Sequence, residues 1–174
     1  METGQTLRET SVRVRGWRAW TVVETSEGLR LGSILHDLVW PVSRPVVAEC
    51  RLRENPLATP LPEHPVPGAV CNCGFHAARD VADALSYARG RDEPRTLCRI
   101  LGEVTLWGHV LETERGWRAS HAYPARLYVP DEQLAAALSA YSVTVCASPS
   151  SRTCTATPPR FAPSSPIWSV TGRS

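Results

Sequence analysis

Apolar and polar residues alternate along the first part of the chain with the two-residue period of strands that bury one face. The alternation covers residues 12–23 and is interrupted at Gly16, where we expect the strand to break. Residues 29–31 and 35–40 are two further short apolar runs, each bounded by turn residues. These patterns predict three short strands in the N-terminal part of the chain.

The middle of the chain holds a longer apolar run over residues 97–111, rich in β-branched and aromatic residues. Gly102 and Gly108 lie inside this run, which predicts a buried strand that bends at the glycines. Residues 116–123 predict a returning strand, with a short extension over 125–129. The short turn between the two long strands would make them an antiparallel hairpin.

Two segments have the spacing of apolar residues that is typical of helices. In the first, we expect a helix that begins at Ala77 or Asp80 and ends at Ala88. In the second, Asp131 is a typical N-cap for a helix over residues 132–141. Strands and helices together predict an α+β fold with a small, mostly antiparallel sheet and two helices.

The length of 174 residues and the hydrophobic fraction of 43% fit one domain with a core of its own. From Cys146 onward the composition changes to serine, threonine and proline, with few large apolar residues. We therefore expect a single domain over residues 11–145 and an irregular tail over 146–174. Trp168 is the tail residue best suited to pack onto the domain.

The charge pattern argues against a nucleic-acid partner, because the formal net charge is only +2 and no long run of one sign occurs. The first residues lack the pattern of a secretory signal, and no stretch has the roughly 18 apolar residues of a membrane span. We therefore expect a cytoplasmic protein without membrane contacts. All nineteen basic residues are arginines. This indicates either the codon usage of a GC-rich bacterial genome or a surface selected for phosphate and carboxylate contacts.

Cysteine and histidine gather in the middle of the chain, in the pattern Cys-X13-His-X6-Cys-X-Cys. In a reducing compartment, cysteines serve as metal ligands or plain thiols rather than as disulfides. Three thiolates and one imidazole suit the tetrahedral coordination of Zn²⁺. The pattern predicts a zinc-knuckle loop with four ligands: Cys50, His64, Cys71 and Cys73. His76 is an alternative to His64, and a second interpretation is that the cysteines are small buried hydrophobic residues.

The predicted hairpin carries polar and ring side chains, several of which share a face because residues two apart on a strand do so. We expect four of them to form a ligand-binding surface: Arg118, His109, Trp107 and His121. The Arg118 guanidinium would hold a carboxylate or phosphate by two parallel hydrogen bonds. A histidine beside a glutamate could also act as an acid or base. The alternative is a solvent face of ion pairs, with Arg118 bonded to Glu103 or Glu112.

The tetrapeptide Gly-Trp-Arg-Ala occurs twice, at residues 16–19 and 116–119. Tryptophan, arginine and alanine are frequent in this chain, so the repeat can arise by chance. The alternative is that the two segments are equivalent strands of a pseudo-symmetric sheet.

Three motifs characterise the central part of the chain. They are Cys-X-Cys-Gly-aromatic-X-Ala at residues 71–77, Gly-Glu-Val-Thr-Leu-Trp-Gly-His-Val at 102–110 and Gly-Trp-Arg-Ala-X-X-Ala-Tyr-Pro at 116–124. Their combination resembles a family of actinobacterial proteins that has no established activity. The resemblance covers about residues 16–130. It implies that the Trp, Gly, Arg and Tyr positions belong to one module, and it carries no catalytic assignment.

The sequence contains no phosphate-binding loop, dinucleotide fingerprint, serine-hydrolase elbow or zinc-protease helix motif. Together with the four-ligand metal set, this favours a small zinc-stabilised binding module for a protein or a small anionic ligand. The alternative is an enzyme acting on a small anionic substrate, with either a three-residue zinc site or the acid–base groups of the hairpin. Nucleic-acid binding through arginine and tryptophan is a third hypothesis, which the low net charge disfavours.

Overall fold

The computed structural model describes residues 6–9, 12–50, 63–88 and 96–147. In this part of the chain eight strands form one sheet, accompanied by two α-helices. The strands are β1 (Thr6–Glu9), β2 (Val14–Thr25), β3 (Gly28–Gly32), β4 (Val46–Val47), β5 (Phe75–Ala78), β6 (Thr96–Thr113), β7 (Gly116–Val129) and β8 (Thr144–Ala147). The helices are α1 (Val81–Ala88) and α2 (Glu132–Leu138), and α2 continues as a 3₁₀ turn over Ser139–Tyr141. The predicted α+β class is confirmed.

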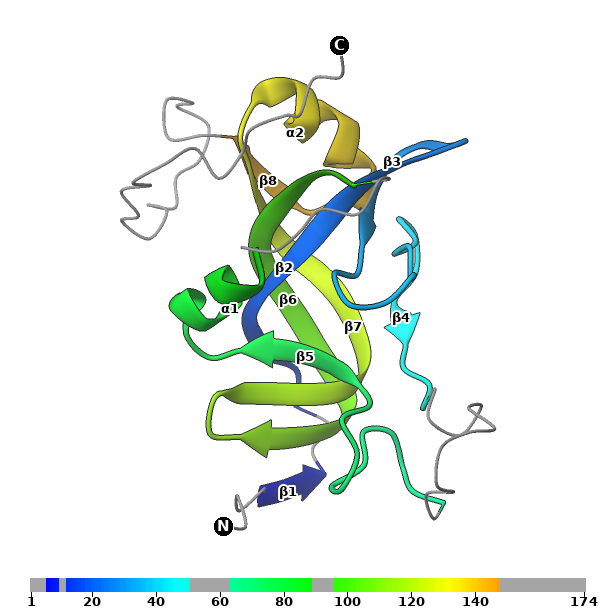
Figure 1. Ribbon diagram of the computed structural model, residues 1–174, viewed down its shortest axis with the longest axis vertical. Coiled ribbons are helices and arrows are strands. Elements are labelled where there is room, and N and C mark those ends of the chain that lie inside the picture. Colours follow the sequence, from blue (N-terminus) through cyan, green and yellow to red (C-terminus); the bar gives the residue numbers. More distant parts are fainter. Residues whose placement is uncertain (1–5, 10–11, 51–62, 89–95, 148–174) are drawn as a thin grey trace.

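The long strands β6 and β7 form the predicted antiparallel hairpin, which organises the sheet (Figure 1). β2 pairs with the other edge of β6, and β5 pairs with both β7 and β2. The strands β2, β6, β7 and β5 therefore close into a ring. β1 adds to β6, β3 adds to β2, and β4 and β8 add to β7. The β7–β8 pair is parallel, whereas the other described pairs are antiparallel.

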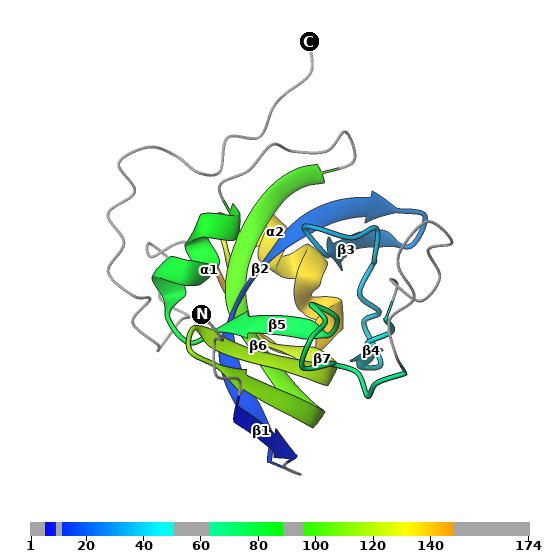
Figure 2. The same ribbon diagram turned by 60° about the horizontal axis from the view of Figure 1, so that its bottom comes forward.

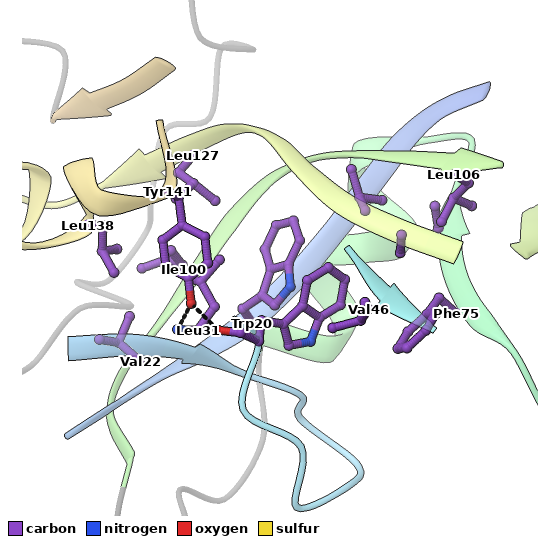
Figure 3. Close-up of a cluster of buried hydrophobic side chains, with 14 of the residues drawn as sticks. Trp20, Val22, Leu31, Val46, Phe75, Ile100, Leu106, Leu127, Leu138 and Tyr141 are labelled. Carbon is purple, nitrogen blue, oxygen red and sulfur yellow. Dashed lines mark hydrogen bonds between the residues drawn. The ribbon is translucent and has the colours of Figure 1, made fainter. Parts of the chain in front are cut away.

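One face of the sheet buries the main hydrophobic core (Figure 3). Trp20 and Trp40 meet edge to face, with ring centroids 5.5 Å apart, and Trp40 meets Phe75 in the same way at 5.4 Å. Such aromatic contacts add to the free energy gained by burying large apolar surfaces. The helix α2 covers this core with Leu134 and Leu138. The core thus joins β2, α2 and β8 to the central hairpin.

The opposite face of the β2–β6 pair is covered by α1 (Figure 2). Ala84 and Ala88 of this helix pack against Ala19 of β2 and Leu101 of β6. These strand residues alternate with those of the main core, so the two helices lie on opposite faces of the sheet. The small alanine side chains let α1 approach the strands closely. No helix in the described residues is long and apolar enough to cross a membrane.

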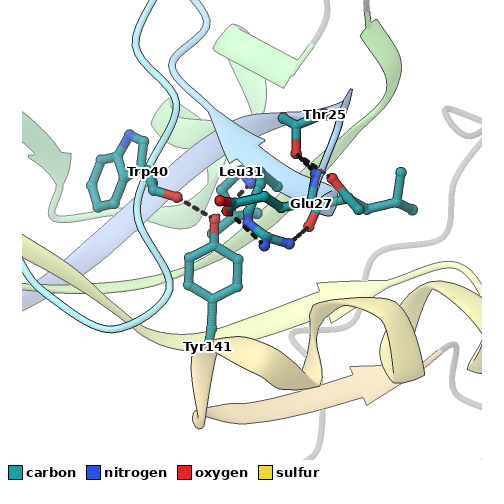
Figure 4. Close-up of polar contacts among 8 residues, drawn as sticks. Thr25, Glu27, Leu31, Trp40 and Tyr141 are labelled. Carbon is teal, nitrogen blue, oxygen red and sulfur yellow. Dashed lines mark hydrogen bonds and ion pairs between the residues drawn. The ribbon is translucent and has the colours of Figure 1, made fainter.

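Tyr141 connects the end of α2 to β3 and to the segment before β4 (Figure 4). Its hydroxyl accepts a hydrogen bond from the Leu31 N–H at 2.8 Å and donates one to the Trp40 carbonyl at 2.6 Å. The side chain is fully buried, and burial raises the pKa of Tyr141 to about 12. Because the hydroxyl both accepts and donates, its burial leaves no unsatisfied polar group.

The strand predictions are correct for the hairpin and for residues 29–31, and two N-terminal expectations are wrong. β2 runs through Gly16 without a break. A Cβ at Gly16 would lie 2.8 Å from the Cβ of Ala77, so glycine here allows β5 to approach rather than breaking the strand. Residues 35–40 form no strand beyond a single bridge between Val39 and Gly32.

The domain limits also differ from the expected range of 11–145. β1 lies before this range, and β8 includes Cys146 and Ala147, both of which are buried. The second helix keeps its predicted cap, since the Asp131 side chain accepts a hydrogen bond from the Leu134 N–H at 2.8 Å. The rest of the predicted tail, with Trp168, lies outside the described residues.

Candidate metal centre

The structure brings Cys50, His64, Cys71 and Cys73 together between the end of β4 and the start of β5. Their ligand atoms, three Sγ and one imidazole nitrogen, all lie within 4.8 Å of one another. Cys50 and Cys71 are buried, whereas His64 and Cys73 are partly exposed. The predicted ligand set thus forms one cluster that could hold a metal ion.

Two distances between ligand atoms of this cluster match the edges of the coordination tetrahedron expected around zinc. The Sγ atoms of Cys50 and Cys71 are 3.7 Å apart, and Cys73 Sγ lies 3.6 Å from His64 Nε2. Tetrahedral bonds of about 2.3 Å to sulfur and about 2.1 Å to nitrogen give edges of about 3.8 Å and about 3.6 Å. The other edges reach at most 4.8 Å, so small side-chain rotations would complete the site.

Two glycines shape residues 64–74, which we call the knuckle loop. A Cβ at Gly68 would lie 1.9 Å from His64 Cδ2, so glycine leaves the space that the imidazole occupies. The Gly68 N–H donates a hydrogen bond to Cys73 Sγ at 3.2 Å. Gly74 has a φ of +104°, a left-handed conformation that permits the chain reversal after Cys73. The loop backbone therefore positions both the imidazole and the thiol.

Arg118 of β7 lies behind the knuckle loop, with only 3% of its surface exposed. Its guanidinium donates hydrogen bonds to the carbonyl oxygens of Gly68 at 3.2 Å and Cys73 at 3.3 Å, and also to that of Cys71. Guanidinium groups suit this role because five N–H donors point outward in one plane. One buried side chain thus fixes the loop backbone around two of the four ligands.

This position of Arg118 differs from both sequence-based expectations. The knuckle loop covers the guanidinium, so it does not face an open ligand surface. The expected glutamate partners are engaged elsewhere: Glu103 with Arg15 at 3.5 Å, and Glu112 with Arg79 at 2.7 Å. The sequence does not predict this role of Arg118, because its partners are backbone carbonyls and no side-chain pattern reveals them.

The repeated Gly-Trp-Arg-Ala segments lie on the two strands that pair with β5. β2 pairs with β5 at one position, Trp17 with Ala78, whereas β7 pairs along the whole of β5. Arg18 of the first repeat donates to the His76 carbonyl at 2.6 Å, whereas Arg118 of the second holds the knuckle loop. The two segments thus share a neighbour but differ in their contacts, and their equivalence stays a prediction.

The two thiols of the knuckle loop, Cys71 and Cys73, differ in pKa. Burial raises the pKa of Cys71, but hydrogen bonds, first among them that from His64, outweigh burial and bring the pKa to about 7. Burial raises the pKa of Cys73 to about 11. Of these two thiols, Cys71 therefore loses its proton at the lower pH. A bound metal ion would favour the thiolate form of both and release protons on binding.

His76, the alternative to His64, lies outside the cluster. It belongs to β5, where Phe75 and Ala77 on either side of it are buried, so its side chain points to the other face of the strand. The side chain is exposed, and its Nε2 lies 3.0 Å from the Asn72 carbonyl oxygen. His64 is therefore the histidine that accompanies the three sulfurs.

Of the predicted ligand surface, Trp107 and His121 are direct neighbours across the hairpin. Their rings stack with centroids 5.8 Å apart and an interplanar angle of 23°. His109 lies beyond a bulge at Gly108, where φ is +81° and the register shifts, so the two-residue alternation from Trp107 does not extend to it. Its N–H donates to Ser120 Oγ at 3.0 Å, which holds the bulge in place.

Comparisons with known proteins do not identify the chain further. No family model matches it, and neither the curated proteins nor the solved structures contain a significant match. The resemblance to the actinobacterial family remains a prediction, and the function has to be inferred from the site itself.

Proposed function

We propose that this chain is a small cytoplasmic binding module in which Cys50, His64, Cys71 and Cys73 ligate one structural Zn²⁺. The observation that carries the proposal is the convergence of three sulfurs and one imidazole nitrogen within 4.8 Å. Thiolate and imidazole are the ligands that zinc prefers, whereas magnesium and calcium prefer oxygen. A reducing compartment would keep the thiols available for the metal.

The surroundings of the cluster favour a structural over a catalytic ion. Structural zinc has four protein ligands, whereas catalytic zinc keeps one position open for water or substrate. Here the chain itself offers a full set of four donors. The knuckle loop is further fixed from behind by Arg118, which is buried. A closed site that joins β4, the knuckle loop and β7 is suited to holding segments together.

The enzymatic alternative has less support from the hairpin. Glu103 forms ion pairs with two arginines, Arg15 at 3.5 Å and Arg126 at 3.9 Å. Glu112 pairs with Arg79 at 2.7 Å. Both carboxylates are thus engaged in ion pairs of the kind found on solvent-facing sheets.

Metal analysis of protein purified without added metal tests the proposal. We expect about one zinc per chain. Cys73→Ser should lose the zinc and unfold at a lower temperature, because metal binding contributes to the folding free energy. Cys98→Ser, on β6 and outside the cluster, is the matched control and should keep the metal. A Cys73→Ser protein with unchanged zinc content would contradict the assignment.

Replacement of the metal by Co²⁺ distinguishes the structural from the catalytic role. We expect the visible absorption of a tetrahedral site with thiolate ligands, unchanged when azide or phosphate is added. A spectrum that shifts on adding these anions would show an open coordination position. It would then favour the enzyme.

A further inference from the structure

A partly open cleft of about 440 Å³ lies beside the hairpin, and none of the residues that line it belongs to the metal centre. Its floor includes Thr105 and Trp107 of β6 and Tyr123 of β7, which alternate with buried core residues along their strands. Residues 42–45 form one side, and Arg13 at the start of β2 forms another. The volume falls in the range of about 300–1,000 Å³ that is typical of small-molecule sites.

The charged residues that line this cleft are of one sign. Arg13 and Arg44 are both exposed arginines, and the described residues that line the cleft include no aspartate or glutamate. Ser43, Thr105 and Ser142 add hydroxyl groups to the lining. Guanidinium and hydroxyl donors without a competing carboxylate suit an anion, and a phosphate in particular.

The Arg13 guanidinium is positioned by a stack of planar groups. Its central carbon lies 5.4 Å from the ring centroid of Trp107, and His121 stacks on the same ring at 5.8 Å. A guanidinium that lies over a tryptophan gains a cation–π interaction and loses part of its conformational freedom. Its N–H donors lie in its own plane, where they can meet a phosphate edge-on.

Arg44 reaches the cleft from a segment that is tied to β7. The Tyr123 hydroxyl donates to the Val42 carbonyl, and Val46 pairs with Ala122. These contacts lie two residues before and two residues after Arg44. The two arginines therefore face the same cleft from separate segments, each of which is held by the hairpin.

We infer that this cleft binds a mononucleotide-type ligand, with its phosphate at Arg13 and Arg44. The inference deepens the binding-module proposal, on which it rests, and none of the residues that line the cleft belongs to the metal centre. Besides donors, the cleft has walls formed by the rings of Tyr123, Pro45 and Pro124, next to Trp107, whose ring already contacts Arg13 and His121. A bare inorganic anion would leave these walls uncontacted, whereas a planar base can pack against them. A small ligand fits the net charge of +2 better than a polyanion does.

Isothermal titration calorimetry of the zinc-loaded chain tests this inference with four probes: AMP, adenosine, inorganic phosphate and a thymidine oligonucleotide. We expect AMP to bind and the two fragments to bind at least about tenfold more weakly, because each lacks one half of the recognised structure. No AMP binding would overturn the inference. An oligonucleotide that binds more tightly than AMP would assign the cleft to single strands and overturn the small-ligand assignment.

Arg13→Ala and Arg44→Ala should each weaken AMP binding by about tenfold or more. Arg115→Ala is the matched control, since it removes an exposed arginine that pairs with Asp83 away from the cleft. Zinc content and circular dichroism, measured on each variant, separate loss of the ligand site from loss of the fold. AMP affinity that is unchanged in both Arg13→Ala and Arg44→Ala would overturn the inference even if the metal assignment holds.

Discussion

The guanidinium of Arg118 donates a hydrogen bond to the backbone carbonyl of Cys73 at 3.3 Å, which links strand β7 directly to a residue of the Cys/His cluster. Burial lowers the pKa of Arg118, but an arginine stays protonated in a protein at neutral pH. A positive charge behind the loop favours the thiolate form of the nearby sulfurs. Arg118 therefore supports the metal centre both by geometry and by charge.

Replacing Arg118 should destabilise the protein. Arg118→Met leaves three loop carbonyls without their donor, so we expect the free energy of unfolding to fall by about 2–4 kcal/mol. Arg118→Lys should recover only part of the lost stability, because an ammonium group lacks the planar set of N–H donors of a guanidinium. Urea denaturation of the zinc-loaded protein measures the effect, with Arg115→Met as the control that leaves the midpoint unchanged. Equal midpoints for Arg118→Met and the parent chain would contradict the role.

Gly68→Ala should damage metal binding through His64. The added Cβ would lie 1.9 Å from the imidazole Cδ2, so the ring would have to leave its place in the cluster. We expect zinc affinity, measured by competition with a chelator, to fall by about tenfold or more. Gly28→Ala is the control: its φ of +100° makes it destabilising, but its Cβ has no neighbour closer than 3.7 Å. If both variants bind zinc alike, the placement of His64 is wrong.

We expect the protein to lose stability at high pH because the hydroxyl of Tyr141 is buried. Its folded-state pKa of about 12 exceeds the ordinary value of 10.0. Because the pKa is raised in the folded state, the Tyr141 hydroxyl contributes fully to the free energy of unfolding below about pH 10. This contribution is lost as the pH rises through about 12, and between these values the free energy of unfolding falls by about 1.4 kcal/mol per pH unit. The Tyr141→Phe variant should be less stable at neutral pH, and its free energy of unfolding should not show this fall between about pH 10 and 12. Urea denaturation across this pH range would refute the prediction if the two slopes were equal.

Zinc removal should weaken AMP binding, because Cys50 ends the segment that carries Arg44. This segment runs beside β7, where the Ala48 N–H donates to the Ser120 carbonyl at 2.7 Å. Without the metal, its far end loses an attachment, and Arg44 becomes less well positioned. Calorimetry before and after chelation measures the coupling, and added zinc should restore the affinity. Identical affinities would show that the two sites act independently.

The predictions that succeeded depend on local sequence. The hairpin follows from two apolar runs separated by a short turn, and the α2 cap follows from Asp131. The clustering of Cys50, His64, Cys71 and Cys73 was predictable because few other roles account for Cys50 and His64 beside a Cys-X-Cys pair. In each of these cases the residue type itself restricts the possible structures.

The features that were missed depend on pairing between distant segments. β8 lies in a stretch of tail-like composition, and its place in the sheet comes from parallel pairing with residues 126–129. A bend at Gly108 is predicted from the sequence, but its form as a bulge depends on Ser120 and His121, which would lie 2.3 Å and 2.6 Å from a Cβ there. Arg118 was read as a surface residue because the loop that covers it approaches only in the folded chain.

A metal ion bound by the cluster would also cross-link Cys50 and His64, which are separated by positions 51–63. The entropy lost on closing such a connection grows only logarithmically, so doubling its length costs about 0.6 kcal/mol. The bound metal would hold Cys50 and His64 in place whatever the number of residues between them. Insertions or deletions within it should therefore be tolerated, and the spacing between the first two ligands should be the most variable distance in the motif.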